Sequence, residues 1–122
     1  HHLGDNRFDG TINSQFQKQS EGAEFSIQFE LSEAQLPPHF NRAQVRLMAK
    51  GVQRNHRIVI NDNTLSRRLN QAPEDGSFGE FRATFDPTVL RAGRNTLQII
   101  AAPSSDDIDD FEFVNVQVRL AP

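Results

Sequence analysis

A run of carboxylates near residue 110 is the feature of this sequence most able to do chemistry. Residues 106–110 contain four aspartates. Closely spaced carboxylates repel one another unless a cation, a basic partner or solvent neutralises them, and Ca²⁺ prefers six to eight oxygen ligands. Asp107 and Asp109 could face one calcium ion, with Asp5 or Asp9 from the N-terminal segment completing its shell. The run indicates either this calcium site or a solvated acidic turn, and its spacing is not that of an EF-hand loop.

A second group of basic and amide side chains lies in the middle of the chain. Arginine presents a planar fork of donors, and asparagine both donates and accepts, so both suit sugar hydroxyls or carboxylates. The chain has no Trp or Tyr, which leaves only an exposed Phe to stack against a sugar ring. The candidate ligand contacts are Arg57, Asn61, Arg67, Arg68 and the ring of Phe78. The alternative is that these side chains are scattered, solvated charges.

Residue types that would support catalysis are sparse. His39 and His56 have no neighbouring His, Cys or Glu at metal-site spacing. There is no G-x-S-x-G motif and no glycine-rich phosphate loop before a helix. Glu74 and Asp75 are sequence neighbours in a loop, where the opposed geometry of a glycosidase carboxylate pair is seldom met. We therefore expect that the chain is not an enzyme.

Strands rather than helices must position these residues. Residues 25–31 and 43–49 alternate apolar and polar side chains, which is typical of half-buried strands, and residues 8–16 could form an edge strand. Phe111 and Phe113 lie on one parity, whereas the following apolar residues lie on the other: Val114, Val116, Val118 and Leu120. A β-bulge near Phe113 and Val114 would bring both sets to one face.

The stretch from His56 to Ala102 has the clearest turn chemistry. A β-branched run at residues 58–60 is closed by Asn61-Asp62-Asn63, because Asn and Asp tolerate positive φ. Residues 81–85 alternate as a strand. Asp86 then follows as a cap for a single helical turn, with Pro87 at its first position and Gly93 available to end it. The chain re-enters the sheet through residues 95–100.

This order resembles the galactose-binding-domain-like β-sandwich of carbohydrate-binding modules and of glycoside hydrolase accessory domains. In that family a strand ends in a V-N-G-type turn, and a later strand leads through a phrase like f-D-(x)-t-x-L-(x)-x-G-x-N-x-L into another strand. The matching residues here are Ile58 to Asn63, and Phe85, Asp86, Leu90, Gly93, Asn95 and Leu97. The resemblance covers roughly the C-terminal half. It implies an all-β antiparallel jelly roll of about eight strands.

The resemblance also implies a function and a compartment. It implies a non-catalytic carbohydrate-binding accessory domain of a larger secreted or cell-surface protein, located extracellularly or in the periplasm. Its partners would be poly- or oligosaccharide and other domains of the same protein, and a structural calcium would lie where the first and last strands meet. The alternative is a structural or protein-interaction sandwich that binds no glycan, which the missing Trp and Tyr favour.

Length and composition limit the number of domains and the kinds of partner that the chain can have. The length of 122 residues fits one domain spanning 1–122, in which we expect residues 1–4 to be a tag remnant or disordered because of His1-His2. The net charge of −3 argues against a nucleic-acid partner. No apolar run approaches the roughly 20 residues of a membrane span, so we expect no membrane insertion. With no Cys, there is no disulfide framework.

Overall fold

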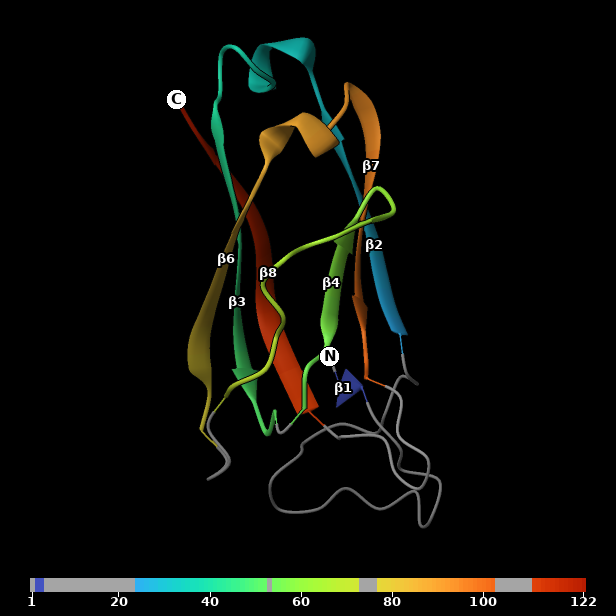
Figure 1. Cartoon of the computed structure of the whole chain (residues 1–122), viewed down its shortest axis with the longest axis vertical. Helices are drawn as coiled ribbons and strands as arrows, with labels where there is room; N and C mark the ends of the chain where they lie inside the picture. Colours follow the sequence, from blue (N-terminus) through green and yellow to red (C-terminus); the bar gives the residue numbers. More distant parts are fainter. Residues whose placement is uncertain (1, 4–23, 53, 73–76, 103–110) are drawn as a thin grey trace.

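Eight strands form two antiparallel sheets in the computed structural model, which describes residues 2–3, 24–52, 54–72, 77–102 and 111–122 (Figure 1). The strands are β1 (His2–Leu3), β2 (Glu24–Leu31), β3 (Arg42–Lys50), β4 (Arg57–Ile60), β5 (Asn63–Thr64), β6 (Gly79–Phe85), β7 (Gly93–Ile100) and β8 (Phe111–Ala121). Two short 3₁₀ turns, η1 (Glu33–Gln35) and η2 (Pro87–Val89), lie in the connections. No helix in the described ranges is long and apolar enough to cross a membrane. The predicted strand at residues 8–16 lies outside the described residues.

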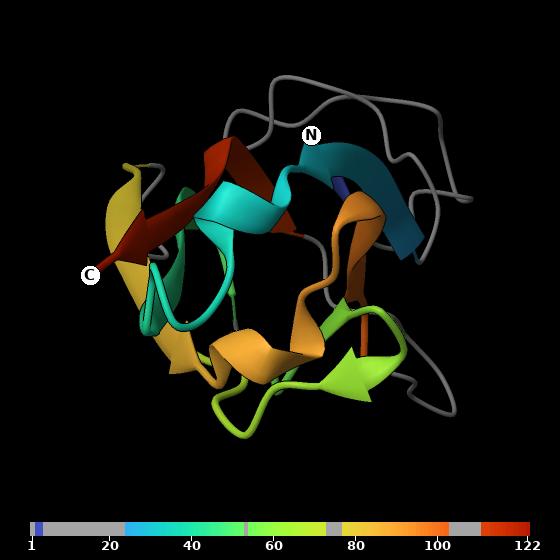
Figure 2. The same ribbon diagram turned by 90° about the horizontal axis from the view of Figure 1, so that it is seen from above.

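The strand order is that of a jelly roll. One sheet has the order β1-β8-β3-β6 and the other β2-β7-β4-β5, so the chain passes from one sheet to the other at most of its connections. Seen from above, the two sheets enclose one interior (Figure 2). The predicted all-β antiparallel jelly-roll sandwich is therefore confirmed.

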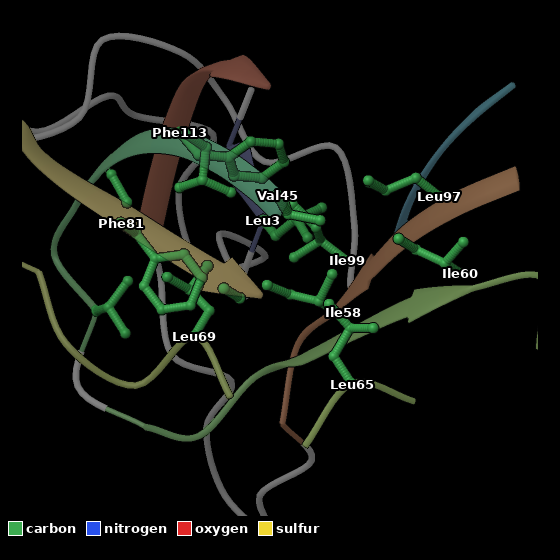
Figure 3. Packing of buried hydrophobic residues seen from close by; sticks show 14 of the residues in the cluster. Leu3, Val45, Ile58, Ile60, Leu65, Leu69, Phe81, Leu97, Ile99 and Phe113 are labelled. Carbon is green, nitrogen blue, oxygen red and sulfur yellow. The ribbon is translucent and has the colours of Figure 1, made fainter. Parts of the chain in front are cut away.

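The core is built from the alternate residues that face between the sheets. All four apolar residues of the predicted β3 face are buried, as are Phe81 and Ala83 of β6 (Figure 3). Ile58, Ile60, Leu97 and Ile99 come from the other sheet. Leu3 is fully buried and β1 pairs with Glu112 and Phe111 of β8, so His2–Leu3 form part of the first sheet, and the tag remnant at residues 1–4 stays a prediction from the sequence.

Strand β2 is less buried than its alternation predicted. Phe25, Phe29 and Leu31 are only partly buried, and Ile27 is 46% exposed. The physical reason is position: β2 is the edge strand of its sheet and pairs with β7 alone. Alternation predicts which face points inward, but it does not reveal whether another strand covers that face.

The predicted bulge in β8 is confirmed, but it lies slightly further along the strand. Arg46 pairs with Gln117 and Met48 with Val114, so β8 contains one extra residue between these pairs, and Asn115 has a φ of 56°. Phe111 and Phe113 point inward before the bulge, and Val116, Val118 and Leu120 pack against the core after it. Because the bulge follows Val114, that residue does not join the inward set.

The turn chemistry of the C-terminal half is confirmed. Asn61 and Asp62 have φ values of 48° and 67°, the backbone of a two-residue type I′ turn between β4 and β5. The Asp86 side chain accepts a hydrogen bond from the Thr88 backbone N–H at 2.9 Å and so caps η2. The turn ends at Leu90, so Gly93, with a φ of 88°, does not end it and instead begins β7.

Candidate binding face

The outward side of β6, β3 and β8 carries a continuous set of polar side chains. On each strand these residues alternate with the buried ones, because successive side chains point to opposite faces of a sheet. Gln44 pairs with Thr84 on β6 and with Arg119 on β8, and Arg46 pairs with Arg82 and Gln117 in the same way. We call this surface the arginine face: Arg42, Gln44, Arg46, Arg82, Thr84, Gln117 and Arg119.

Two adjoining hollows lie on the arginine face. One has a volume of about 430 Å³ and is lined by Arg42, Gln44, Arg82 and Thr84 among others. The other, of about 370 Å³, extends toward Glu80, Asn115 and Gln117. Arg46 and Arg119 line both hollows, so the two form one open strip across the three strands. Each hollow is in the size range of a small-ligand site.

Glu80 neutralises the centre of the arginine face. Arg46 and Arg82 lie directly opposite each other, an arrangement of like charges that destabilises a sheet. The Arg46 guanidinium donates to Glu80 Oε1 at 2.7 Å, and the Arg82 Nε also donates to this oxygen. The hydrogen bonds from Arg82 and then Arg46 hold the pKa of Glu80 below its ordinary value, and Glu80 in turn raises the pKa of Arg82.

The other two arginines of this face have no such partner. Among the residues that the structure describes, the side chains of Arg42 and Arg119 make no hydrogen bond or ion pair, and both residues are exposed. Arg119 lies opposite Gln44, and Arg42 lies two residues before Gln44 on β3, so the two arginines are diagonal neighbours. Two guanidinium groups are thus available to a ligand at one end of the strip.

The five predicted ligand contacts do not come together. The Asn61 Nδ2 donates to Val89 O and to Asn95 Oδ1, and its Oδ1 accepts the Thr96 backbone N–H, so Asn61 links the β4–β5 turn to β7. Its amide is engaged within the fold, and its role as a ligand contact stays a prediction from the sequence. Val89, one of these partners, follows β6 in the chain, whereas Phe78 directly precedes it. A seven-residue strand is roughly 20 Å long, so Asn61 and Phe78 lie near opposite ends of β6.

Phe78 and the three arginines also have separate surroundings. The Lys50 ammonium lies 4.7 Å from the Phe78 ring centroid, so one side of this half-buried ring is occupied, and its role as a stacking surface stays a prediction from the sequence. The Arg67 guanidinium lies 5.0 Å from the centroid of the Phe81 ring. Arg68 Nη1 is buried without a hydrogen-bond partner, and Arg57 is exposed on β4 in the other sheet.

The predicted calcium ligands lie outside the described residues. Asp5 and Asp9 fall within 4–23, and Asp107 and Asp109 within 103–110. In the part of the chain that the structure describes, no three His, Cys, Asp or Glu side chains come close enough to hold a metal ion. The calcium site therefore stays a prediction from the sequence.

His56 is part of the core. It is fully buried, and its ring stacks on Phe111 with 4.0 Å between the ring centroids. Its Nδ1 accepts the Ala102 backbone N–H at 2.9 Å. Lys50 and Glu112 form a second buried polar pair nearby in the β3–β8 ladder, with 3.7 Å between Nζ and Oε2. The His56 hydrogen bond and the Lys50–Glu112 ion pair therefore link segments of the fold that are distant in sequence.

The residues of the arginine face had a sequence signal, but a weak one. The alternation in residues 43–49 predicts a strand with one apolar face. Its other, polar face carries Arg42, Gln44 and Arg46. A polar parity alone indicates only a solvated face. What identifies this one as a candidate site is its alignment with β6 and β8, whose residues lie more than 30 positions away in sequence.

Comparison with known proteins supports the fold. No protein-family model matches the sequence, and no curated protein sequence matches it. A solved structure of an uncharacterized protein from Listeria monocytogenes aligns with 92% of this chain at 16% identity and a TM-score of 0.50. The fold implied by the sequence resemblance is confirmed. The chain spans 10% of that Listeria protein.

Two solved carbohydrate-binding modules also align with the chain over nearly its whole length. A family 35 carbohydrate-binding module from an environmental isolate is 22% identical, covers 97% of this chain and 85% of its own, and has a TM-score of 0.45. A CBM35 from Cellvibrio japonicus is 19% identical, covers 98% and 87%, and has a TM-score of 0.46.

Proposed function

We propose that this chain is a non-catalytic carbohydrate-binding module, an accessory domain of a larger extracellular or periplasmic protein, and that glycan binds on the arginine face. One observation carries the proposal: three strands of a rigid sheet present an open polar strip with two adjoining hollows. Its amide, hydroxyl and guanidinium groups are donors and acceptors suited to sugar hydroxyls. An open strip accommodates an extended polymer more readily than an enclosed small molecule.

The chemistry of the face fits binding rather than hydrolysis. Glycoside hydrolysis ordinarily uses a pair of carboxyl groups on either side of the scissile bond. Glu80 is the single carboxylate among the described residues that line the two hollows, and two arginines engage it. Of the residues that the structure describes, none with an aromatic ring lines either hollow. We therefore expect weak, hydrogen-bond-dominated affinity, since little apolar surface is buried on such a face.

A panel of soluble poly- and oligosaccharides, tested by calorimetry, examines this function. Replacing Gln44 with Ala removes an amide at the centre of the strip. We expect glycan affinity to fall about fivefold, the equivalent of one hydrogen bond worth about 1 kcal/mol. Gln28→Ala is the matched control, because Gln28 is an exposed glutamine on β2 of the other sheet. Affinity for no glycan while the protein is folded, or equal losses in both variants, would contradict the proposal.

A second candidate function, a structural or protein-interaction domain, is favoured by a different surface. Ile27, Phe29, Leu97, Val116 and Val118 line an apolar opening of about 160 Å³ between the two sheets. Exposed apolar surface beside an edge strand is a common site of strand pairing between proteins. Light scattering would show a dimer at micromolar concentration if two copies pair there, and Ile27→Asn should abolish it. A monomer in both proteins would count against pairing between two copies.

A further inference from the structure

The arginine face carries positive charge that the fold does not neutralise. Among the described residues, four arginines and one glutamate are the ionisable side chains that line the two hollows, and their charges sum to +3. The whole chain has a net charge of −3. The positive charge is therefore concentrated on one sheet surface against the overall sign of the molecule, which is the pattern of a surface that attracts an anion.

The charge is also ordered along the strands. Arg42, the Gln44–Arg119 row and the Arg46–Arg82 row occupy three successive outward positions of β3 and its neighbours. Successive outward positions on one strand are about 7 Å apart, twice the rise per residue. Guanidinium groups thus recur along the strip at a spacing that an extended chain with regular anionic groups can follow.

The arginines of this strip differ in whether another side chain of the protein already binds them. Arg46 and Arg82 already donate to Glu80, whereas the Arg42 and Arg119 side chains have no hydrogen bond or ion pair among the described residues. A guanidinium matches a carboxylate or sulfate group with two parallel hydrogen bonds, and such charge-assisted pairs are stronger than neutral ones. An anionic group between Arg42 and Arg119 would therefore accept charge-assisted hydrogen bonds from both guanidinium groups, as Glu80 does from Arg46 and Arg82.

We propose that the arginine face selects glycans bearing repeated anionic groups, carboxylate or sulfate, with Arg42 and Arg119 as the principal contacts. This inference rests on the proposed function and names its ligand class. A single-stranded nucleic acid also carries regular negative charge, but its binding usually depends on aromatic side chains on which bases stack. No aromatic residue from the described part of the chain lines either hollow, so the face fits a glycan better than a nucleic acid.

Matched polymers that differ only in charge test the proposal. The carboxylate arm compares polygalacturonate with its carboxyl-reduced form, and the sulfate arm compares dextran sulfate with dextran. We expect at least one anionic polymer to bind about tenfold or more tightly than its neutral partner, because each charge-assisted contact exceeds a neutral one by that order. Raising NaCl from 0.05 to about 0.5 M should weaken this binding, since salt screens exposed charges.

Variants locate the contact. The double variant Arg42→Gln/Arg119→Gln should lose tenfold or more in affinity for the bound anionic polymer, by the same estimate. The control is Arg94→Gln, which removes an exposed arginine from β7 in the other sheet and should leave affinity within about twofold, because it lies far from the strip. Thermal melting confirms that all variants fold. Equal losses in the double variant and the control would overturn the assignment to this face.

Other outcomes separate this inference from the proposed function. Equal affinity for charged and neutral partners, or binding only to neutral glycans, overturns the anionic selectivity and leaves the carbohydrate-binding function standing. Binding to neither kind of polymer overturns both. Binding of a single-stranded oligodeoxythymidine as tightly as the anionic glycans overturns the glycan assignment, because the face would then recognise charge alone.

Discussion

At the scale of single residues, Glu80 decides how much of the arginine face is neutralised. It is held between two cations that would otherwise repel each other across the β3–β6 pair. This explains why its pKa is lowered: hydrogen bonds from Arg82 and Arg46 favour the ionised carboxylate, and burial opposes them only weakly. The same contacts make Glu80 an internal competitor for any anionic ligand at Arg46 and Arg82.

The lowered pKa of Glu80 makes a prediction about acid stability. A carboxylate whose folded-state pKa lies below its unfolded value of about 4.5 stabilises the fold above that value, and this contribution is lost as pH falls through the lower folded-state pKa. We expect the melting temperature of Glu80→Gln to fall less steeply than that of the wild type below pH 4.5.

Melting curves between pH 7 and pH 2.5 provide the measurement. Asp86, whose pKa is lowered by hydrogen bonds from the Thr88 backbone and side chain, is present in both proteins and gives them a common acid-dependent loss. Parallel pH profiles for wild type and variant would show that the two arginine contacts of Glu80 contribute nothing to stability in solution, as is common for exposed ion pairs.

At the scale of elements, the Asn61–Asn95 pair joins the β4–β5 hairpin to β7. Asn95 is fully buried, and its amide is fully bonded: Oδ1 accepts from Asn61 Nδ2 and the Arg91 N–H, and Nδ2 donates to the carbonyls of Arg91 and Gly93. Both asparagines belong to the sequence phrases that carried the family resemblance. Those phrases therefore encode the junction of turns and strands.

Replacing Asn95 with Ala should destabilise the fold by about 2–4 kcal/mol, because it leaves buried donors and acceptors without partners. Urea denaturation measures the change in the free energy of unfolding. Asn63→Ala is the control: its exposed amide bonds only the carbonyls of its own turn, so the loss should stay below about 1 kcal/mol. Equal losses in the two variants would contradict the role given to the Asn61–Asn95 link.

At the scale of the whole molecule, the two sheets have different surfaces. The outer side of β6, β3 and β8 carries the arginine face, whereas the rim between β2 and β8 has the apolar opening beside Ile27. The jelly roll supports both, because its two sheets each keep one side for the core and leave the other to solvent. The proposed glycan binding and the alternative protein interaction would therefore use different surfaces of the molecule.

The calcium prediction also belongs to this scale, since its four aspartates come from both ends of the chain. If they bind calcium in the folded state alone, free calcium at 100 times its dissociation constant adds about 2.7 kcal/mol to stability. For a chain of this length we expect a rise in melting temperature of about 10 °C over the chelator-treated protein. Asp107→Asn/Asp109→Asn should remove the rise, and an absence of any rise in the wild type would leave residues 106–110 as a solvated acidic turn.

The sequence by itself determined the features that depend on near neighbours. Alternation of side chains identified the strand at Ala43 to Ala49 and its buried face, because the period of two follows from backbone geometry. Asn61-Asp62 specified its turn, and Asp86-Pro87 specified the capped 3₁₀ turn, since each acts on backbone groups one to three residues away. The parity change in β8 predicted a bulge for the same reason, although not the residue at which it occurs.

Only the tertiary structure decided where the candidate site lies. The arginine face combines rows from β6, β3 and β8, and nothing local to Arg46 indicates that Arg82 and Gln117 become its neighbours. The fold likewise engaged Asn61 with Asn95, and it separated Phe78 from Asn61 along the length of β6. The physical reason is that strand order and register are set by the packing of the whole core. Polar side chains gather into a binding surface only after that register is fixed.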